Sequence, residues 1–354
     1  MPFLSHYRLS VRQDSKNPTS INMSLGLPTV SGSLEGISPL ILGGAVFNTQ
    51  YNDNPEKIPI TDLLEEAFKL GINAIDTSPY YGPSEVLLGH ALNQLIEGGK
   101  IKRDQCYICT KVGRLQLDDF DYTPEWIEKS VKRSIERFQT TYLDVVFLHD
   151  IEFKTLDDSI AALRMLMHLK SQGLIKWVGI SGYTVDYLYQ VAKKVKSIPE
   201  IGPLDLVMNY SNMCLQNTTL ESYYDRFITE TGVRMVNNAS ILSMSLLRYQ
   251  ETRSFHPAGA RLKQKCKDLA IMLENDYDTD LADLATRFAM KKWADKKGRT
   301  VLGVSNIAEL QAAWNQYSDV TAHAEDERSE KLFKISQRFL GEHLNETWSS
   351  GIEH

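Results

Sequence analysis

The sequence predicts an α/β fold, a (β/α)8 TIM barrel, from three observations. From residue 39 onward, short apolar runs alternate with amphipathic stretches, and eight such runs can be counted. This alternation is typical of parallel strands joined by right-handed crossovers. The length of 354 residues suits one large barrel. The rival fold, an open doubly wound sheet, would need a Gly-rich dinucleotide loop after an early strand, and the sequence has no G-x-G-x-x-G motif.

The first half of the barrel contains four predicted strands, at 40–44, 72–76, 106–111 and 143–149. The helix predicted at 60–70 has apolar residues at helical spacing and ends at Gly71, a residue favoured at helix C-termini. The next helix, 83–96, begins with Pro83 and stops at a Gly-Gly pair. A third helix begins at Thr123-Pro124-Glu125, a strong N-terminal signal.

The second half repeats this pattern. Strands are predicted at 177–181, 204–209, 233–237 and 300–304. Helices are predicted at 156–171, 185–195, 220–229, 260–273 and 281–294, with an eighth barrel helix starting at 308.

Both ends of the chain differ from this pattern. Residues 1–35 are rich in Ser, Asn and Pro, so we expect a mobile N-terminal arm, although its basic residues leave a mitochondrial presequence open. Residues 36–354 are expected to form the barrel with a C-terminal helical tail, in which 322–354 lie across the barrel mouth or along its outer wall.

Composition excludes several classes of function. A net charge of -6 gives no reason to expect nucleic acid or an anionic membrane as a partner, and no apolar run is long enough to cross a bilayer. We expect a cytoplasmic protein. The pair Cys106 and Cys109 has C-x-x-C spacing, but residues three apart on a strand point to opposite faces, so we predict two buried thiols and no metal site. The oligomeric state stays open.

Polar residues end three neighbouring strands, where barrel enzymes place their chemistry. They are Asp76 with the following Tyr81, then Lys111, then His149. Each alone has an ordinary structural explanation, such as a cap, a packed turn or a solvated charge. Together they form a usable set, because a tyrosine hydroxyl with a pKa of about 10 needs a nearby cation to exchange protons at neutral pH. Lys111 can supply that cation, Asp76 can hold Lys111, and His149 can orient the substrate oxygen.

The ordered set Asp76, Tyr81 five residues later, Lys111 and His149 resembles the catalytic tetrad of the aldo-keto reductases. The resemblance spans 39–314 and implies a barrel that binds a nicotinamide dinucleotide extended across its mouth. Segments 48–51, 76–89, 143–153, 238–248 and 346–352 are most similar to the fungal D-arabinose 1-dehydrogenases, and more distantly to plant L-galactose dehydrogenases. These enzymes oxidise C1 of an aldose to the aldonolactone, upstream of ascorbate-like compounds. The implied partner is therefore a small sugar.

The resemblance also implies where the cofactor binds. Its contacts would lie after strands one, five, six, seven and eight, at Gly44, Ser181, Asn209, Ser240, Leu242, Met244, Gly303, Ser305, Asn306 and Glu309. Two positions depart from the family: Ala239 replaces a Tyr that many members stack under the nicotinamide, and Val207 replaces a frequent Gln. Segment 303–315 has no Lys or Arg, and its one charge is Glu309, so NAD is expected rather than NADP.

Some alternatives remain at this point. A general NAD(P)H-dependent aldehyde or ketone reductase would use the same tetrad. A cofactor-binding regulatory subunit, like the potassium-channel β subunits, would share the fold and the tetrad. A phosphate-sugar isomerase or aldolase barrel would not need the tetrad. Asp150, Glu152 and Arg248 are candidates for binding sugar hydroxyls or, equally, for solvated positions at the rim.

Overall fold

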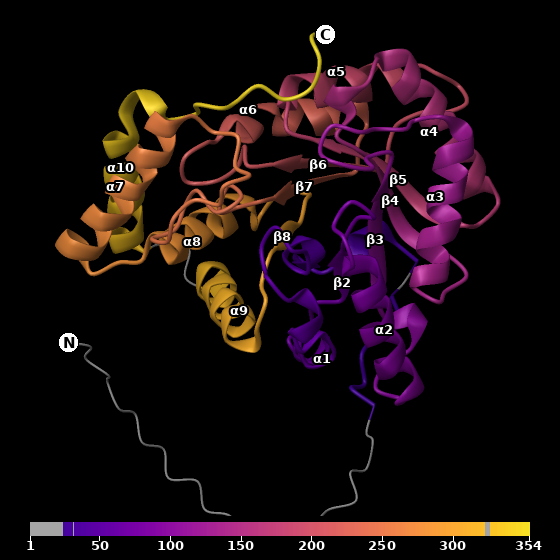
Figure 1. The fold of residues 1–354 in the computed structure, drawn as a ribbon, viewed down its shortest axis with the longest axis horizontal. Coiled ribbons are helices and arrows are strands. Elements are labelled where there is room, and N and C mark those ends of the chain that lie inside the picture. The colour runs from indigo at the N-terminus through magenta and orange to yellow at the C-terminus, as the bar shows by residue number, and fades with distance from the viewer. Residues whose placement is uncertain (1–23, 31, 323–325) are drawn as a thin grey trace, which may run out of the picture.

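Eight parallel strands close on themselves in the order β1 to β8, and helices surround them (Figure 1). This arrangement comes from a computed structural model that describes residues 24–30, 32–322 and 326–354. Closure depends on β1 pairing with β8, where Leu40 lies opposite Thr300. The predicted (β/α)8 barrel is therefore confirmed.

Each predicted strand is present. The strands are β1 (Leu40–Gly43), β2 (Ala74–Asp76), β3 (Tyr107–Val112), β4 (Leu143–His149), β5 (Ile175–Gly182), β6 (Leu206–Tyr210), β7 (Met235–Ala239) and β8 (Thr300–Leu302). Strands β5 to β8 each end within two residues of the predicted position. Strand β7 extends to Ala239 because that residue pairs with Tyr210 of β6.

The helices follow the strands in turn. They are α1 (Ile60–Lys69), α2 (Ser84–Glu97), α3 (Pro124–Arg137), α4 (Leu156–Ser171), α5 (Val185–Val195), α6 (Thr219–Arg226), α7 (Ala260–Tyr277), α8 (Leu281–Trp293), α9 (Ile307–Ala322) and α10 (Glu327–Leu340). Both α7 and α8 come between β7 and β8, and α10 packs beside α7 on the outside of the barrel (Figure 1).

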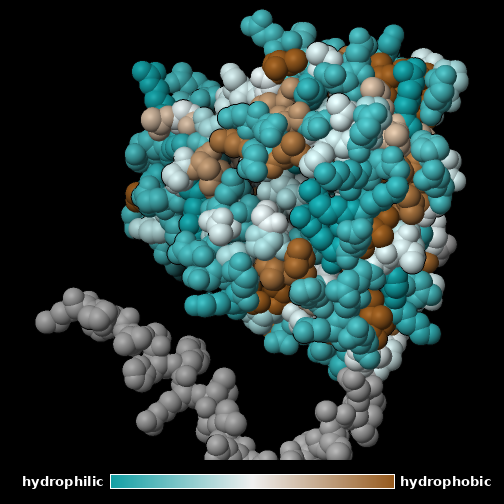
Figure 2. Space-filling model, turned by 45° about the vertical axis from the view of Figure 1, so that its right-hand side comes forward, coloured by the Kyte–Doolittle hydropathy of each residue, from teal (hydrophilic) through white to brown (hydrophobic). Residues whose placement is uncertain are grey.

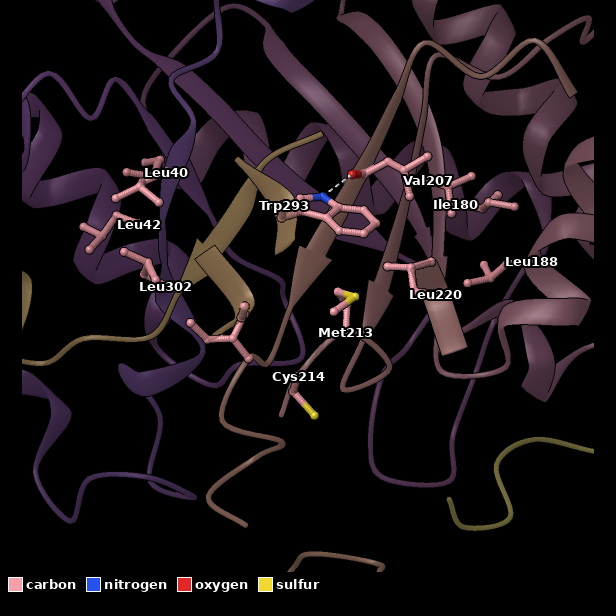
Figure 3. Packing of buried hydrophobic residues seen from close by; sticks show 14 of the residues in the cluster. Leu40, Leu42, Ile180, Leu188, Val207, Met213, Cys214, Leu220, Trp293 and Leu302 are labelled. Carbon is pink, nitrogen blue, oxygen red and sulfur yellow. Dashed lines mark hydrogen bonds between the residues drawn. The ribbon is translucent and has the colours of Figure 1, made fainter. Parts of the chain in front are cut away.

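Alternate residues of each strand serve two separate cores. One core fills the barrel interior, and the other lies between the strands and the helices, where Figure 3 shows Val207, Ile180 and Leu188. In this outer core, the indole of Trp293 donates a hydrogen bond of 3.0 Å to the Val236 carbonyl (Figure 3).

The two strand cysteines confirm the alternation. Cys106 belongs to the outer core and Cys109 to the barrel interior. All four cysteines are free and buried.

The segment before β1 closes the bottom of the barrel. Leu34 and Ile37 are buried in the interior core, and the Tyr107 hydroxyl donates to the Ser33 carbonyl at 2.7 Å. Most of the predicted N-terminal arm, residues 1–23 and 31, lies outside the described residues. The described remainder, 24–30 and 32–35, packs against the barrel through apolar side chains: Leu25 and Leu27 contact the outer core, and Val30 and Leu34 the interior core.

The C-terminal segment after α10 runs past α6 and ends beside α5 (Figure 1). Its last residue, His354, stacks on Tyr187 of α5 with ring centroids 3.6 Å apart. On the face drawn in Figure 2, hydrophobic side chains form small separate patches in a mostly hydrophilic surface. Among the described helices, none combines the length and the apolar character needed to span a bilayer.

Candidate active site

Tyr81 is placed by a tight turn between β2 and α2. Its amide donates to the Ser78 carbonyl at 3.0 Å, and its own carbonyl accepts from the Ser84 amide at 3.1 Å. Gly82 follows with φ of +54°, a left-handed conformation that glycine adopts at little cost. The turn therefore reverses the chain directly after the strand and leaves the tyrosine ring at the barrel mouth.

Lys111 and Asp76 form a buried ion pair beneath that ring. The Lys111 ammonium donates to Asp76 Oδ1 at 2.5 Å and to the Thr77 carbonyl at 2.9 Å, and the lysine has no exposed surface. The same ammonium lies 4.9 Å from the centre of the Tyr81 ring. Because β2 and β3 are hydrogen-bonded neighbours, three of the four predicted catalytic groups meet at one point.

His149 completes the set from the end of β4. Its ring lies perpendicular to the Tyr81 ring, with centroids 6.0 Å apart, and its Nδ1 is 3.2 Å from the Ser78 hydroxyl. Burial lowers the pKa of His149 well below its ordinary value, and the positive charges of Lys111 and Arg114 lower it further. The imidazole is therefore neutral at physiological pH and can donate from one nitrogen only.

The pKa of Tyr81 is raised well above 10, first by burial and then by the carboxylates of Asp76 and Asp150. The positive charge of Arg114 acts in the opposite direction but does not offset them. The structure thus holds Tyr81 as a neutral phenol, the form that can donate a proton to a carbonyl oxygen.

A cavity of about 530 Å³ opens beside the tetrad. Asp76 and Tyr81 line one end, and the start of α9 lines the other. This volume is within the range of small-molecule and cofactor sites. Of the residues predicted to bind a cofactor, six line it: Ser240, Leu242, Met244, Gly303, Ser305 and Glu309.

The four other predicted residues do not line the cavity. A side chain at Gly44 would meet Ser84 Oγ at 2.7 Å, so this glycine is required by close packing on α2, whereas its neighbours Gly43 and Ala45 line the cavity. Ser181 is fully buried. Asn209 donates to the Gly182 and Tyr183 carbonyls at 3.0 Å.

Asn306 is the fourth, and it acts as the N-cap of α9. Its Oδ1 accepts from the Glu309 amide at 2.9 Å, while the Glu309 carboxylate accepts from the Ser305 amide at 2.8 Å and from its hydroxyl at 3.2 Å. This reciprocal arrangement resembles a capping box and fixes Glu309 on the cavity wall.

The loop after β7 is held in an unusual conformation. Ser240, Ser243, Met244 and Ser245 all have positive φ, a region that such residues rarely occupy. Backbone strain of this kind concentrates at ligand sites.

Two arginines that line the cavity from this loop were not among the predicted cofactor contacts. They are Arg248 and Arg253, and the Nε atom of each is buried without a hydrogen-bond partner among the described residues. Burial lowers the pKa of Arg248, and Arg253 lowers it further. In the sequence, these two arginines could have been found only as a pair of cations in the long loop that follows the seventh strand.

The two departures from the family pattern have different outcomes. Val207 points into the outer core and does not line the cavity (Figure 3). Ala239 does line it, and so does the ring of Tyr210 from the neighbouring strand. An aromatic wall is therefore present, although it comes from β6.

The described part of the chain contains no group of three or more His, Cys, Asp and Glu side chains that could hold a metal ion.

Known proteins share this architecture and sequence. Residues 39–327 match the Aldo/keto reductase family. The chain is 47% identical over 325 residues to a D-arabinose 1-dehydrogenase of Saccharomyces cerevisiae, covering 91% of this chain and 96% of the relative. It is 31% identical over 321 residues to an L-galactose dehydrogenase of Arabidopsis thaliana, covering 90% of this chain and 92% of the relative.

Among solved structures, an aldo-keto reductase from Bacillus halodurans in its holo form matches with a TM-score of 0.62 at 23% identity, covering 85% of this chain and 92% of that one. This likeness concerns the fold, and the family assignment comes from the sequence. The chain therefore belongs to the aldo/keto reductase family, whose members are oxidoreductases that use nicotinamide cofactors.

Proposed function

We propose that this enzyme oxidises the C1 hydroxyl of a cyclic aldose to the aldonolactone with NAD, and that D-arabinose is its best substrate. The buried Asp76–Lys111 pair beneath Tyr81 is the observation that carries the chemistry. The choice of sugar is supported by the yeast relative named D-arabinose 1-dehydrogenase, which matches this chain over almost its whole length.

The cavity fits a dinucleotide. It extends from Tyr81 at the catalytic end to Glu309 at the start of α9, and the unpartnered Nε atoms of Arg248 and Arg253 offer charged donors to a pyrophosphate. When bound, the nicotinamide supplies the acceptor for the C1 hydride.

The chain's own residues handle the proton. Tyr81 accepts the proton of the C1 hydroxyl during oxidation and returns it to the carbonyl oxygen during reduction. Oxidation needs the phenol to lose its proton, and the ammonium of Lys111 stabilises the resulting anion. Neutral His149 donates a hydrogen bond to the same sugar oxygen, while Ser78 holds the other ring nitrogen.

A preference for NAD over NADP follows from Glu309. Its carboxylate occupies the Ser305 amide and hydroxyl, two donors that could otherwise bind a 2′-phosphate. The carboxylate also repels a phosphate and can accept a hydrogen bond from a free ribose hydroxyl.

The test of cofactor choice is kcat/KM with NAD and NADP for the wild type, Glu309→Arg and Glu309→Gln. We expect wild type to favour NAD, and Glu309→Arg to shift the ratio toward NADP by at least about tenfold. The Gln variant keeps an oxygen for the Ser305 donors, so it separates the charge from the helix cap. A wild-type preference for NADP would contradict the proposal.

The test of the substrate is a sugar panel monitored through reduced-cofactor absorbance. D-Arabinose should be oxidised at C1, L-galactose and L-fucose should follow, and xylose and glucose should be poorer. Unpaired polar groups penalise sugars with the wrong hydroxyl pattern. Brisk reduction of simple aromatic aldehydes with no activity on these sugars would favour a general reductase. Very slow turnover of everything, together with a stable protein partner, would favour a regulatory subunit.

A cytoplasmic location is also proposed. Its support is that all four cysteines are free and buried, which suits a reducing compartment. Fractionation of cells that produce the full chain would test it, and recovery with mitochondria would contradict it.

A further inference from the structure

Asp150 breaks the side-chain alternation of β4. His149 points into the barrel mouth, so the next residue of a regular strand would point outward. Asp150 instead has φ of +54° and ψ of +60°, a left-handed conformation. This turn brings its Oδ2 to 3.5 Å from His149 Nε2, on the same side as the catalytic groups. A strained backbone that re-aims one side chain is a frequent feature of functional sites.

Arg114, from the loop after β3, fixes the Asp150 carboxylate. Its Nη1 donates to Asp150 Oδ2, and its Nη2 donates to the Leu117 carbonyl at 2.8 Å. The guanidinium lies over the Tyr80 ring, 4.2 Å from its centre. Because the arginine is bonded on one side and stacked on another, it has little freedom to move, and the carboxylate has one orientation.

The second oxygen of this carboxylate lacks a partner. Asp150 is only 1% exposed, and its Oδ1 makes no hydrogen bond to any described residue. A buried carboxylate oxygen without a donor costs free energy, so a ligand that supplies the donor would bind favourably. The pKa values of Tyr81, Tyr183 and Tyr210 are raised mainly by burial, and the negative charge of Asp150 raises each of them further.

We propose that Asp150 determines substrate specificity by accepting a hydrogen bond from the C2 hydroxyl of the aldose. The inference rests on the proposed function, in which His149 holds the C1 oxygen. Oxygens on adjacent sugar carbons are separated by about one hydrogen-bond length. The unpartnered Oδ1 belongs to the carboxylate whose other oxygen, Oδ2, lies 3.5 Å from His149 Nε2. One sugar can therefore contact both groups at the same time.

This assignment defines the substrate class as aldehydes and hemiacetals with a hydroxyl next to the reacting carbon. A simple aldehyde offers no donor and leaves Asp150 unpaired. Sites built to bind a hydroxyl discriminate strongly against analogues that lack it. Asp150 thus supplies a physical reason for a sugar dehydrogenase to ignore general carbonyl compounds.

The test uses two pentoses that differ only at C2. D-Arabinose and 2-deoxy-D-ribose share every other hydroxyl, so their kcat/KM ratio isolates the contact. We expect the wild type to favour D-arabinose by at least about tenfold. In Asp150→Asn the ratio should fall to within about threefold of one, because the amide oxygen stays with Arg114 and the amide nitrogen, which can only donate, replaces the free acceptor Oδ1.

Glu152→Gln is the matched control, since Glu152 is a buried carboxylate in the same loop that binds the Tyr183 amide and the Ser350 hydroxyl. It should keep the wild-type ratio. Binding of reduced cofactor, followed by fluorescence, and thermal melting report whether each variant is folded.

Two outcomes overturn the inference alone. A wild-type ratio near one does so without any variant, and an equal loss on both sugars in Asp150→Asn would show that Asp150 has only a structural role. If the wild type oxidises neither pentose, the proposed function fails and this inference fails with it.

Discussion

The two sides of the barrel mouth differ in how their charges are paired. On the β2–β4 side, Lys111 is bonded to Asp76 and Arg114 to Asp150. On the β7–β8 side, Arg248 and Arg253 have no carboxylate partner among the described residues, and each repels the other. The β2–β4 side is therefore paired within the protein itself, whereas the β7–β8 side keeps two arginine Nε donors that an anionic ligand could bind. Removing one charge should therefore lower stability strongly on the β2–β4 side and change it little on the β7–β8 side.

The largest effect is expected from Tyr81→Phe on the paired side. The substitution removes only the hydroxyl, so turnover should fall on the order of 100- to 10,000-fold while the cofactor still binds. Steady-state kinetics and cofactor titration measure the two effects separately. Turnover at the wild-type rate would show that another group moves the proton.

Lys111→Met tests the pairing itself. Removing one member of a buried ion pair strands the Asp76 carboxylate, and this costs about 3–5 kcal/mol of unfolding free energy. The double variant Lys111→Met/Asp76→Leu should recover most of that loss, although it should remain inactive. Denaturant unfolding curves of the single and double variants measure this recovery. If the two variants were equally stable, the loss in Lys111→Met would not come from an unpaired Asp76 carboxylate.

Arg253→Ala tests the unpaired side. Loss of a charge-assisted contact should weaken cofactor binding by about tenfold to a hundredfold. Stability without cofactor should change little, because relief of the repulsion with Arg248 offsets the lost hydrogen bond to the Tyr51 carbonyl. Arg261→Ala, an exposed arginine on α7, is the control and should change neither property. If Arg253→Ala lost stability but kept its cofactor affinity, Arg253 would be a structural residue and not a ligand-binding one.

The smallest effect concerns Glu152, where burial, and then Asp150, raises the carboxyl pKa from 4.5 to about 7. Because the pKa of Glu152 is higher in the folded than in the unfolded state, the stabilisation from the protonated carboxyl is fully present below the unfolded-state pKa. It is lost as the pH rises toward 7. Glu152→Gln should therefore match the wild type near pH 5 and exceed it by about 1–2 kcal/mol near pH 8. Melting curves of Glu152→Gln and of the exposed control Glu353→Gln across this range would reveal it, and parallel profiles would contradict it.

The sequence predicted the paired side better than the unpaired side. Asp76, Lys111 and His149 end short apolar strands, and neighbouring parallel strands must bring such ends together. Arg253 lies in a loop without periodicity, and its contact with the Tyr51 carbonyl joins residues about 200 positions apart, so no local pattern places it at the cavity.

Gly44 and Asp150 show two other limits. A glycine after a strand can serve close approach to a ligand or close packing on a helix, and the letter alone does not distinguish them. Asp150 follows His149 in sequence, so the alternation of a regular strand assigns it to the opposite face. Only the left-handed backbone reveals that it shares the catalytic side. The solvated-rim interpretation was wrong for Asp150 and Glu152, because both are buried.

The C-terminal segment has a consequence for biosynthesis. The Glu152 carbonyl accepts from the Ile352 amide at 2.9 Å, and its carboxylate accepts from the Ser350 hydroxyl at 3.1 Å. Strand β8 is synthesised some fifty residues before these groups, so a nascent chain can close its barrel while the loop that carries His149 and Asp150 still lacks its outer support. A ribosome-bound chain stalled before Ser350 should therefore be protease-resistant in the barrel yet unable to discriminate between sugars. Folding and substrate selection would thus mature at different moments of translation.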